Sequence, residues 1–403
     1  MGSDVGSVHL GSVARVRSGY AFRSEDMGDV GRPIVKIKNV VPPTVDLLDC
    51  DRVSDKVFAG IPDIDRYVLE EGDILIAMTG ATVGKVGRVP RISERFYLNQ
   101  RVGKVYLTAP NRADYRYLYY VLSQDGPAQQ MLGTAQGSAQ ANISGSEIER
   151  LEIPLPTLSR QRTIAHILGS LDDKIELNRR MNQTLESMAR SLFDASFLVG
   201  TIESVPLSGL VESIRDQIRP FDFPDRTFDH YSLPAFDDSQ TPVREPGVGI
   251  MSAKWRVPED ALLISRLNPQ IERVWMPDLA SDAESVCSTE FLVLRAVQPY
   301  TRAFVYCLVR SEAFQEQIRS VVTGTTGSHQ RAQRDAVLSL PAIAPAPRMV
   351  KWFDSMASPM MSRALLARRQ RAELMSIRDA ILPELLSGNL PARATDRVIG
   401  AIP

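Results

Sequence analysis

The side chains best suited to chemistry gather in loops rich in glycine, serine, asparagine and glutamine, and the chemistry that they suit is recognition of nucleic acid. Asparagine and glutamine can bond adenine through two hydrogen bonds, arginine can bond guanine in the same way, and lysine and serine suit phosphates. Most polar loop residues are simply solvated, and this alternative stays open for each candidate. Within residues 1–157 the candidates are Thr79, Lys85, Arg88, Gln136, Ser138, Gln140 and Asn142. Within residues 200–346 they are Arg266, Asn268, Gln270, Ser328, His329, Gln330, Arg331 and Arg334.

Three lysines lie near predicted strands and form a second group of candidates for DNA binding. These are Lys36, Lys38 and Lys254, each of which could contact a phosphate. A charge on the solvated face of a sheet is the default explanation for such lysines.

Motifs for catalysis are absent or incomplete. Gly80–Val86 resembles a phosphate-binding loop, but it is one residue short between its glycines, and Val86 stands where a serine or threonine would bind magnesium. A tight turn between two strands is therefore favoured, and a nucleotide hydrolase that uses Gly80–Lys85 is the enzymatic alternative. The histidines lie outside metal-ligand spacing and no Gly-x-Ser-x-Gly elbow occurs. The sequence predicts a chain that is not an enzyme and binds no metal or cofactor.

The composition predicts a globular protein of the cytoplasm, with 44% hydrophobic and 24% charged residues. No apolar run approaches the roughly 18–20 residues of a membrane helix, and the N-terminus lacks the apolar segment of a secretory signal. Cys50, Cys287 and Cys307 stand far apart, as expected for reduced thiols. The formal net charge of −1 counts mildly against a stand-alone nucleic-acid binder, but it is compatible with partners that supply phosphate contacts.

The two halves of the chain repeat each other at an offset of about 189 residues. Gly72–Ile76 corresponds to Glu259–Leu263, and Thr134–Gln140 corresponds to Gly324–Gln330. Each half ends in a long amphipathic segment. A globular unit followed by a helix, used twice, indicates a protein that carries two different recognition surfaces on a rigid spacer.

The first long helix is predicted over residues 159–197, with apolar residues alternately four and three apart, as in a coiled coil. Its seam contains Asn178 and Asn182. The second helix is predicted over residues 348–386, with Gly388 as its C-cap and Pro359 marking either a start or a kink. Two arginines of its weaker seam, Arg371 and Arg378, are expected either to reach solvent or to meet the asparagines and acids of the first helix. The residues expected to pair the helices are Ile164, Leu168, Leu171, Ile175, Leu185, Phe353, Met360, Leu374 and Ile381.

These patterns predict an α/β (α+β) fold with an internal pseudo-two-fold repeat and two long helices paired as an antiparallel coiled coil. Strands are expected at Pro33–Val40, Asp73–Ala77 and Val102–Leu107, and a helix at Tyr115–Ser123. The predicted organisation is a first globular domain at 1–157 and a first spacer helix at 158–199, followed by a second globular domain at 200–346 and a second spacer helix at 347–390. A disordered tail is expected at 391–403.

Several segments, in order, resemble the specificity subunit of type I restriction–modification enzymes over roughly residues 8–390. The hinge and first helix of that family resemble Ile153–Pro156, Ser159–Leu168 and Leu171–Ile175. Its first target-recognition domain resembles Gly72–Leu75 and Leu98–Val102, and its second resembles Tyr231–Asp237 and Ser265–Pro269. Its C-terminal helix resembles Ile377–Gly388. The second hinge departs from the family pattern, since Ala344–Arg348 lacks the proline-leucine-proline and glutamine that are usual there.

The resemblance implies a non-catalytic subunit in which each globular domain reads one half of a bipartite, asymmetric site in double-stranded DNA. The helices set the unspecified spacer between the halves, and two methyltransferase subunits dock on the helices and recognition domains. Each methyltransferase flips an adenine and methylates its N6 from S-adenosylmethionine. Two restriction subunits can join and cleave with ATP and Mg²⁺. The family implies that none of these cofactors binds this chain.

Two further interpretations stay open. One is the specificity subunit of a related two-subunit restriction system, in which a single partner carries both nuclease and methyltransferase. The other is a duplicated scaffold that binds no DNA.

Overall fold

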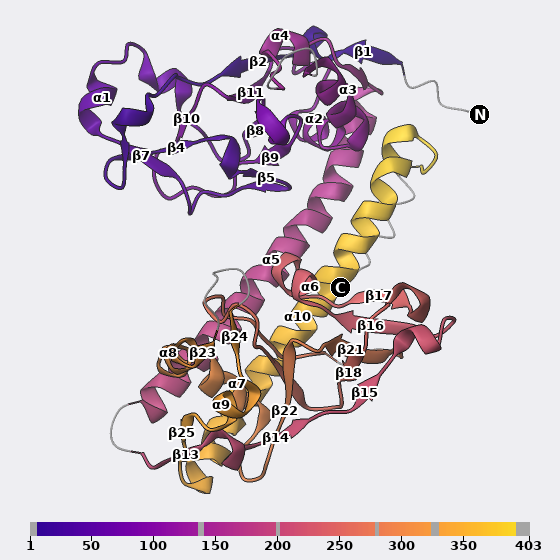
Figure 1. Ribbon diagram of the computed structural model, residues 1–403. Helices are drawn as coiled ribbons and strands as arrows, with labels where there is room; N and C mark the ends of the chain where they lie inside the picture. Colours follow the sequence, from indigo (N-terminus) through magenta and orange to yellow (C-terminus); the bar gives the residue numbers. More distant parts are fainter. Residues whose placement is uncertain (1–5, 136–140, 199–201, 279–281, 324–329, 392–403) are drawn as a thin grey trace. The chain divides into compact units, whose positions relative to one another are not determined.

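The computed structural model describes residues 6–135, 141–198, 202–278, 282–323 and 330–391, and Figure 1 shows its helices and strands. The chain divides into two compact units. Unit 1 consists of Met1–Asp172 and Ser376–Pro403, and unit 2 consists of Asp173–Met375. Each unit combines β-sheets with helices, so the predicted α/β (α+β) class is confirmed. The predicted tail at 391–403 lies, apart from Pro391, outside the described residues.

Unit 1 is built on a six-stranded sheet in the order β2-β11-β8-β9-β6-β5. The side chains of β8 are all buried, as expected for the central strand of a covered sheet. Strand β11 has the predicted bounds, and β8 begins one residue later than predicted. The six strands are β2 (Ala14–Ser18), β11 (Val102–Leu107), β8 (Ile74–Ala77), β9 (Val86–Arg88), β6 (Thr44–Val45) and β5 (Val40–Val41).

Smaller sheets and helices complete unit 1. A four-stranded sheet contains β10 (Tyr97–Leu98), β4 (Arg32–Val35), β7 (Asp51–Val53) and β3 (Met27–Gly28), and β1 (Ser7–His9) pairs with β12 (Glu152–Pro154). The short helices are α1 (Asp55–Ala59), α2 (Tyr115–Leu122), α3 (Asp125–Ala135) and α4 (Gly145–Ile148).

Unit 2 is built on a four-stranded sheet in the order β14-β22-β19-β20, which repeats the order β2-β11-β8-β9 of unit 1. These strands are β14 (Val211–Ile214), β22 (Phe291–Ala296), β19 (Ala261–Ser265) and β20 (Val274–Trp275). A five-stranded sheet contains β15 (Gln217–Ile218), β18 (Lys254–Arg256), β21 (Glu284–Ser288), β16 (Thr227–Tyr231) and β17 (Val243–Pro246). The remaining strands are β13 (Ser204–Pro206), β25 (Pro341–Ile343), β23 (Val322–Thr323) and β24 (Arg331–Ala332). The short helices are α6 (Leu233–Asp238), α7 (Arg302–Arg310), α8 (Glu312–Ser320) and α9 (Arg334–Leu338).

The offset of the repeat is visible in these bounds. Strand β11 begins at Val102 and β22 begins at Phe291, 189 residues later. Strand β2 begins at Ala14 and β14 at Val211, 197 residues later, so the spacing changes between the first strand and the rest of the sheet. The predicted internal repeat is confirmed.

The strand predicted over Pro33–Val40 is wrong in its second half. Strand β4 ends at Val35, and Ile37–Asn39 forms a single 3₁₀ turn. The buried Asn39 accepts from the backbone N–H of Lys36 at 2.9 Å and donates to the carbonyl of Asp49 at 2.9 Å. A side chain that bonds nearby backbone in this way competes with a sheet ladder, and here it turns the chain.

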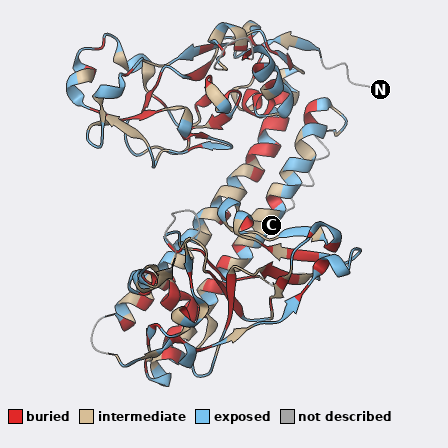
Figure 2. Cartoon of the chain, viewed as in Figure 1, coloured by how far each residue is buried: buried red, intermediate tan, exposed pale blue. Residues whose placement is uncertain are grey.

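Two long helices, α5 (Leu158–Phe197) and α10 (Pro347–Ser387), carry the predicted seam. In unit 1 Asp172 of α5 contacts Arg378 of α10. In unit 2 the helices run antiparallel, because Glu186 of α5 pairs with Arg368 of α10, whereas Phe193, later on α5, meets Phe353, earlier on α10, with ring centroids 5.8 Å apart. Figure 2 shows buried residues recurring on one side of each helix.

The predicted seam residues are all at least half-buried. Fully buried are Ile164, Leu168, Leu171 and Phe353, with Leu374 at 6% exposure, and half-buried are Ile175, Leu185, Met360 and Ile381. Gly388 has φ +90° and follows the last residue of α10, which confirms the predicted C-cap. Helix α10 begins at Pro347, so a start after Pro359 is wrong. Proline is tolerated at the first helical position because its missing N–H has no partner there.

Candidate nucleic-acid interface

In unit 1 the two predicted recognition loops meet through backbone hydrogen bonds. The N–H of Gly80 donates to the carbonyl of Ala141 at 2.8 Å, and the N–H of Ile143 donates to the carbonyl of Met78 at 2.9 Å. Thr79 and Asn142 face each other as an antiparallel bridge. We call Met78–Gly80 and Ala141–Ile143 the paired loops of unit 1.

In unit 2 the corresponding residues form the same pairing. The N–H of Asn268 donates to the carbonyl of Gln330 at 2.9 Å, and the N–H of Ala332 donates to the carbonyl of Arg266 at 3.0 Å. Leu267 and Arg331 form the bridge between them. The paired loops of unit 2 are therefore Arg266–Asn268 and Gln330–Ala332, and they occupy the positions of the paired loops of unit 1.

The backbone conformation of the two loop pairs agrees as well. Gly80 has φ +73° and Asn268 has φ +48°, so both adopt the left-handed conformation. Glycine enters this region without steric cost, and asparagine is among the few other residues that enter it with ease. The sequence difference between Gly80 and Asn268 thus preserves the turn.

The outward side chains of the paired loops differ between the units. In unit 1 the exposed Asn142 accepts at Oδ1 a hydrogen bond from Oγ1 of the buried Thr79, at 3.0 Å. In unit 2 the exposed Arg331 donates from Nη2 and Nε to the two carboxylate oxygens of Glu290, at 2.7 and 3.1 Å. This contact raises the pKa of Arg331.

Arg266 and Arg334 line a pocket of about 240 Å³ next to the paired loops of unit 2. Arg266 donates from Nη2 to the carbonyl of Thr289 at 2.9 Å, and its buried Nε has no hydrogen-bond partner among the described residues. Arg334 donates to the hydroxyl of Ser213 at 3.2 Å and to Asp335 at 2.9 Å. Arg215 and Asp335 also line the pocket, so its wall carries three guanidinium groups and one carboxylate.

The remaining loop candidates are spread over different environments. Lys85 and Gln270 are exposed, whereas Gln330 is half-buried. Arg88 is half-buried, with its guanidinium carbon 5.7 Å from the ring centre of Tyr119. The predicted residues Gln136, Ser138, Gln140, Ser328 and His329 lie outside the described residues.

The three candidate lysines are all engaged by neighbours. Lys36 and Lys38 bond the two carboxylate oxygens of Asp51, at 2.7 and 2.8 Å, and these hydrogen bonds, that of Lys36 first, lower the pKa of Asp51. Lys254 is only 6% exposed and donates to Ser252, and burial lowers its pKa. The default explanation of a charge on a solvated face is therefore wrong for Lys254.

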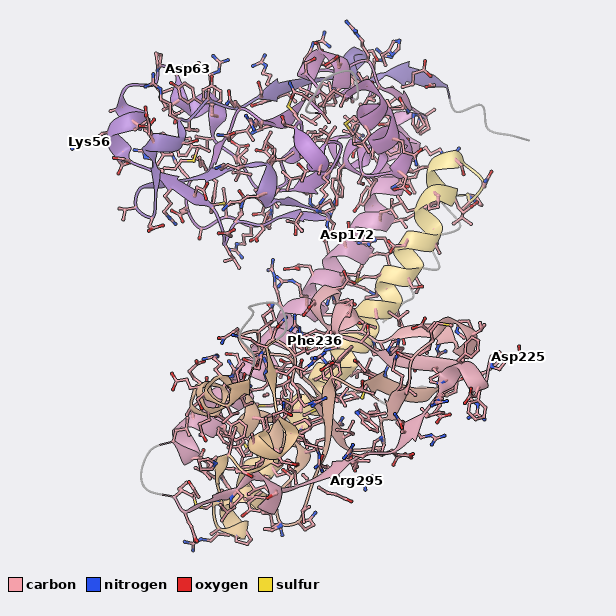
Figure 3. All side chains as sticks on the ribbon, in the orientation of Figure 1. Lys56, Asp63, Asp172, Asp225, Phe236 and Arg295 are labelled. Atoms are coloured by element: carbon pink, nitrogen blue, oxygen red, sulfur yellow. The ribbon has the colours of Figure 1, made fainter. Side chains whose placement is uncertain are left out.

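The helices of unit 1 carry a polar network, of which only the contact of Arg378 was predicted from the sequence. The carboxylate of Asp172 accepts from the hydroxyl of Tyr120 at 2.5 Å and from Arg378 at 3.2 Å (Figure 3 labels Asp172). Arg378 was expected to meet either solvent or a polar residue of the first helix, and it meets an acid. The fully buried Gln161 bonds the backbone of Asp114, Arg112 and Pro156 and so fixes the start of α5.

The helices of unit 2 carry a different polar network. Glu186 of α5 bonds Arg368 of α10 and Arg310 of α7, both at 2.7 Å. Burial acts to raise the pKa of Glu186, but the two arginines outweigh it, and the pKa is lowered. Arg371 is half-buried with no hydrogen-bond partner for its buried Nε among the described residues, and burial lowers its pKa.

Comparisons with known proteins address the family directly. Residues 2–187 match the model of the type I restriction modification DNA specificity domain. The predicted resemblance to type I specificity subunits is thereby confirmed.

Two relatives of the specificity domain come from Methanocaldococcus jannaschii. The type I restriction enzyme MjaVIII specificity subunit is 26% identical over 195 residues, which cover 46% of this chain and 44% of that protein. The type I restriction enzyme MjaIX specificity subunit is 23% identical over 302 residues, 68% of each chain. The match to the MjaVIII subunit thus spans less than half the length of that protein.

The fold is shared with a solved specificity subunit. The crystal structure of the type I restriction–modification S subunit from M. genitalium superposes with a TM-score of 0.58 at 15% identity, over 94% of this chain and 96% of that chain. This similarity supports the two-unit, two-helix fold.

No helix among the described residues is long and apolar enough to span a membrane, and no group of three or more metal-ligating side chains occurs within the same described ranges.

Thr79, a predicted DNA contact, is buried and donates to Asn142. Two other residues near the paired loops, Glu290 and Arg101, were not predicted from the sequence. The repeat could have drawn attention to the last two, because Glu290 and Arg101 each directly precede the corresponding strands β22 and β11. Their backbone carbonyls accept from Arg266 and Met78, at 2.9 and 3.0 Å, which confirms that the two positions correspond.

Proposed function

We propose that the chain is the non-catalytic specificity subunit of a type I restriction–modification complex and that each unit reads one half of a bipartite, asymmetric site in double-stranded DNA. The observation that carries this proposal is the pair of loops that recurs in both units with the same backbone bonds and different outward side chains. One scaffold used twice, with changed side chains, suits two half-sites of different sequence. The match of residues 2–187 to the model of the DNA specificity domain supports DNA as the ligand.

The helices α5 and α10 act in this proposal as the ruler that sets the unspecified spacer. The α5 helix has 40 residues, and at a rise of 1.5 Å per residue it is about 60 Å long. Half-site spacing is a geometric property of a DNA-binding protein, so the number of residues in the helices determines the spacer.

Partner subunits supply the chemistry in this proposal. Two methyltransferase subunits bind the complex, flip an adenine in each half-site and transfer a methyl group from S-adenosylmethionine to N6. Restriction subunits that use ATP and Mg²⁺ act on unmethylated sites where they are present. The net charge of −1 agrees with phosphate contacts that are shared with the partners, in a complex that works in the cytoplasm.

The test is a comparison of methylomes in a host without adenine methylation. One strain expresses the chain with the methyltransferase encoded beside it, and the control strain expresses the methyltransferase alone. The proposal expects N6-methyladenine at a gapped, two-part motif that appears only when the chain is present. A soluble complex that produces no such motif would overturn the proposal.

A further inference from the structure

We propose that Asn142 and Arg331 are equivalent base-reading side chains of the two units, and that they read adenine in one half-site and guanine in the other. This inference rests on the proposed function and adds to it a residue and a base for each half-site. Its basis is the placement of these two side chains on the paired loops and the different neighbour that orients each of them.

The two positions correspond in backbone, exposure and direction along the strand. Each is the bridge residue of its loop pair, opposite Thr79 in unit 1 and Leu267 in unit 2. In both loops the residue that follows, Ile143 or Ala332, is buried, while Asn142 and Arg331 are exposed. Neighbouring residues of an extended segment point to opposite faces, so Asn142 and Arg331 occupy the outward face of their loops.

Asn142 is held in one orientation by Thr79. The hydroxyl of Thr79 donates to Oδ1 of Asn142 at 3.0 Å, and Thr79 is itself buried, with only 6% exposure. An amide oxygen has two lone pairs, and the adjacent NH₂ group donates. An amide oriented in this way offers both the acceptor and the donor that adenine requires at N6 and N7.

Arg331 is held in one orientation by Glu290. The carboxylate contacts Nε and Nη2 of Arg331, along one edge of the guanidinium group, while the side chain stays 46% exposed. A guanidinium group is planar and rigid, and its end carries a second fork of donors on its two Nη atoms. Such a fork matches O6 and N7 of guanine, which is the commonest specific contact of arginine with DNA.

The neighbour that orients each side chain is missing from the other unit. Where unit 1 has Thr79, unit 2 has Leu267, which cannot donate a hydrogen bond to an amide. Where unit 2 has Glu290, unit 1 has the exposed Arg101, which would repel an arginine at position 142. Each orienting neighbour therefore suits only its own reader, and two chemically different readers are built on one backbone.

The first experiment determines the methylation motif of Arg331→Ala in the complex with the methyltransferase. A lost bidentate contact lowers discrimination by about fivefold or more, so one guanine in one half-site is expected to become degenerate while the other half-site stays unchanged. Glu290→Gln should weaken discrimination at the same guanine. The matched control is Arg319→Ala, which removes an arginine paired with Glu312 on α8 and should leave the motif unchanged.

The second experiment moves the reader of unit 2 into unit 1. Asn142→Arg alone places the new guanidinium near Arg101 and should abolish the adenine preference without a sharp replacement. Adding Arg101→Glu supplies the carboxylate that unit 2 has, so the double variant should specify guanine at that position. Methylome sequencing of both variants decides between the outcomes.

The outcomes separate this inference from the proposed function. A wild-type complex without any gapped motif would overturn both. A wild-type motif that stays unchanged in Arg331→Ala, or a double variant that still specifies adenine, would overturn the inference and leave the proposed function intact. If Arg331→Ala abolishes methylation, Arg331→Lys keeps the charge without the fork, and a guanine still fully specified in that variant would count against the inference.

Discussion

Arg378 of α10 donates to the carboxylate of Asp172 of α5 at 3.2 Å, and the two residues lie 206 positions apart in the chain. Tyr120 donates to the same carboxylate at 2.5 Å. The repeat places Ala189, Met361 and Val309 at the corresponding positions of unit 2, and all three belong to its apolar core. At these three positions the packing of the long helices is thus charged and polar in unit 1 and apolar in unit 2.

Removing Arg378 should destabilise unit 1. Arg378→Ala leaves the carboxylate of Asp172, whose side chain is 16% exposed, without its cation, and breaking a buried pair costs about 3 kcal/mol. Urea unfolding followed by circular dichroism measures the change.

The triple variant that copies unit 2 provides the control. Tyr120→Val, Asp172→Met and Arg378→Ala together replace the network by apolar side chains, which is often neutral or stabilising. We expect the triple variant to be more stable than Arg378→Ala. Strict addition of the three single losses would refute this account.

The hinge of unit 1 should depend on Gln161. Its side chain is completely buried and bonds three backbone groups, two as a donor and one as an acceptor. Gln161→Leu should cost about 2–4 kcal/mol because it leaves buried polar groups unsatisfied. The repeat places the fully buried Val350 at this position of α10, so Val350→Leu is a matched control with a small expected loss. Equal losses of stability in the two variants would contradict the role of Gln161.

The stability of unit 2 should fall at low pH because of Glu186. Its pKa is lowered from 4.5 in the folded state, since Arg368 and Arg310 outweigh the effect of burial. A group with a lowered folded pKa stabilises above its unfolded pKa, and this contribution is lost as the pH falls through the folded pKa. The free energy of unfolding should therefore differ between wild type and Glu186→Gln at pH 7, and the difference should shrink below pH 4.5. A difference that is independent of pH would exclude this role for Glu186.

The length of the helices should determine the spacer of the DNA motif. Insertion of one heptad after Leu177 in α5 and one after Ala372 in α10 falls between the Asp172–Arg378 and Glu186–Arg368 pairs and keeps both. Seven residues add about 10 Å, which corresponds to about three base pairs. Methylome sequencing should show the same two half-sites with a longer gap. Altered half-sites with an unchanged gap would contradict the ruler.

Local patterns predicted the parts of the molecule that depend on local sequence. The strand Val102–Leu107 and the seam residues around Leu168 follow from periodicity, because burial repeats with the geometry of the element. The internal repeat then identified the loops that meet at Thr79 and Asn142.

Contacts between distant side chains could not be predicted in the same way. Asp51 forms ion pairs with both Lys36 and Lys38, and Glu290 forms an ion pair with Arg331, although other acidic residues lie closer to these cations in sequence. The partner of a charge depends on tertiary proximity, which periodicity does not encode. The site was therefore predicted at the level of its loops, and the neighbours that orient its side chains required the structure.

The division of the chain into units has a consequence for its synthesis. Unit 2 is one uninterrupted stretch, Asp173–Met375, whereas unit 1 needs Ser376 and the residues after it. Because the cation for Asp172 lies in this late segment, a chain emerging from the ribosome can complete unit 2 before unit 1 receives Arg378. The domain that is translated first is the one that is finished last.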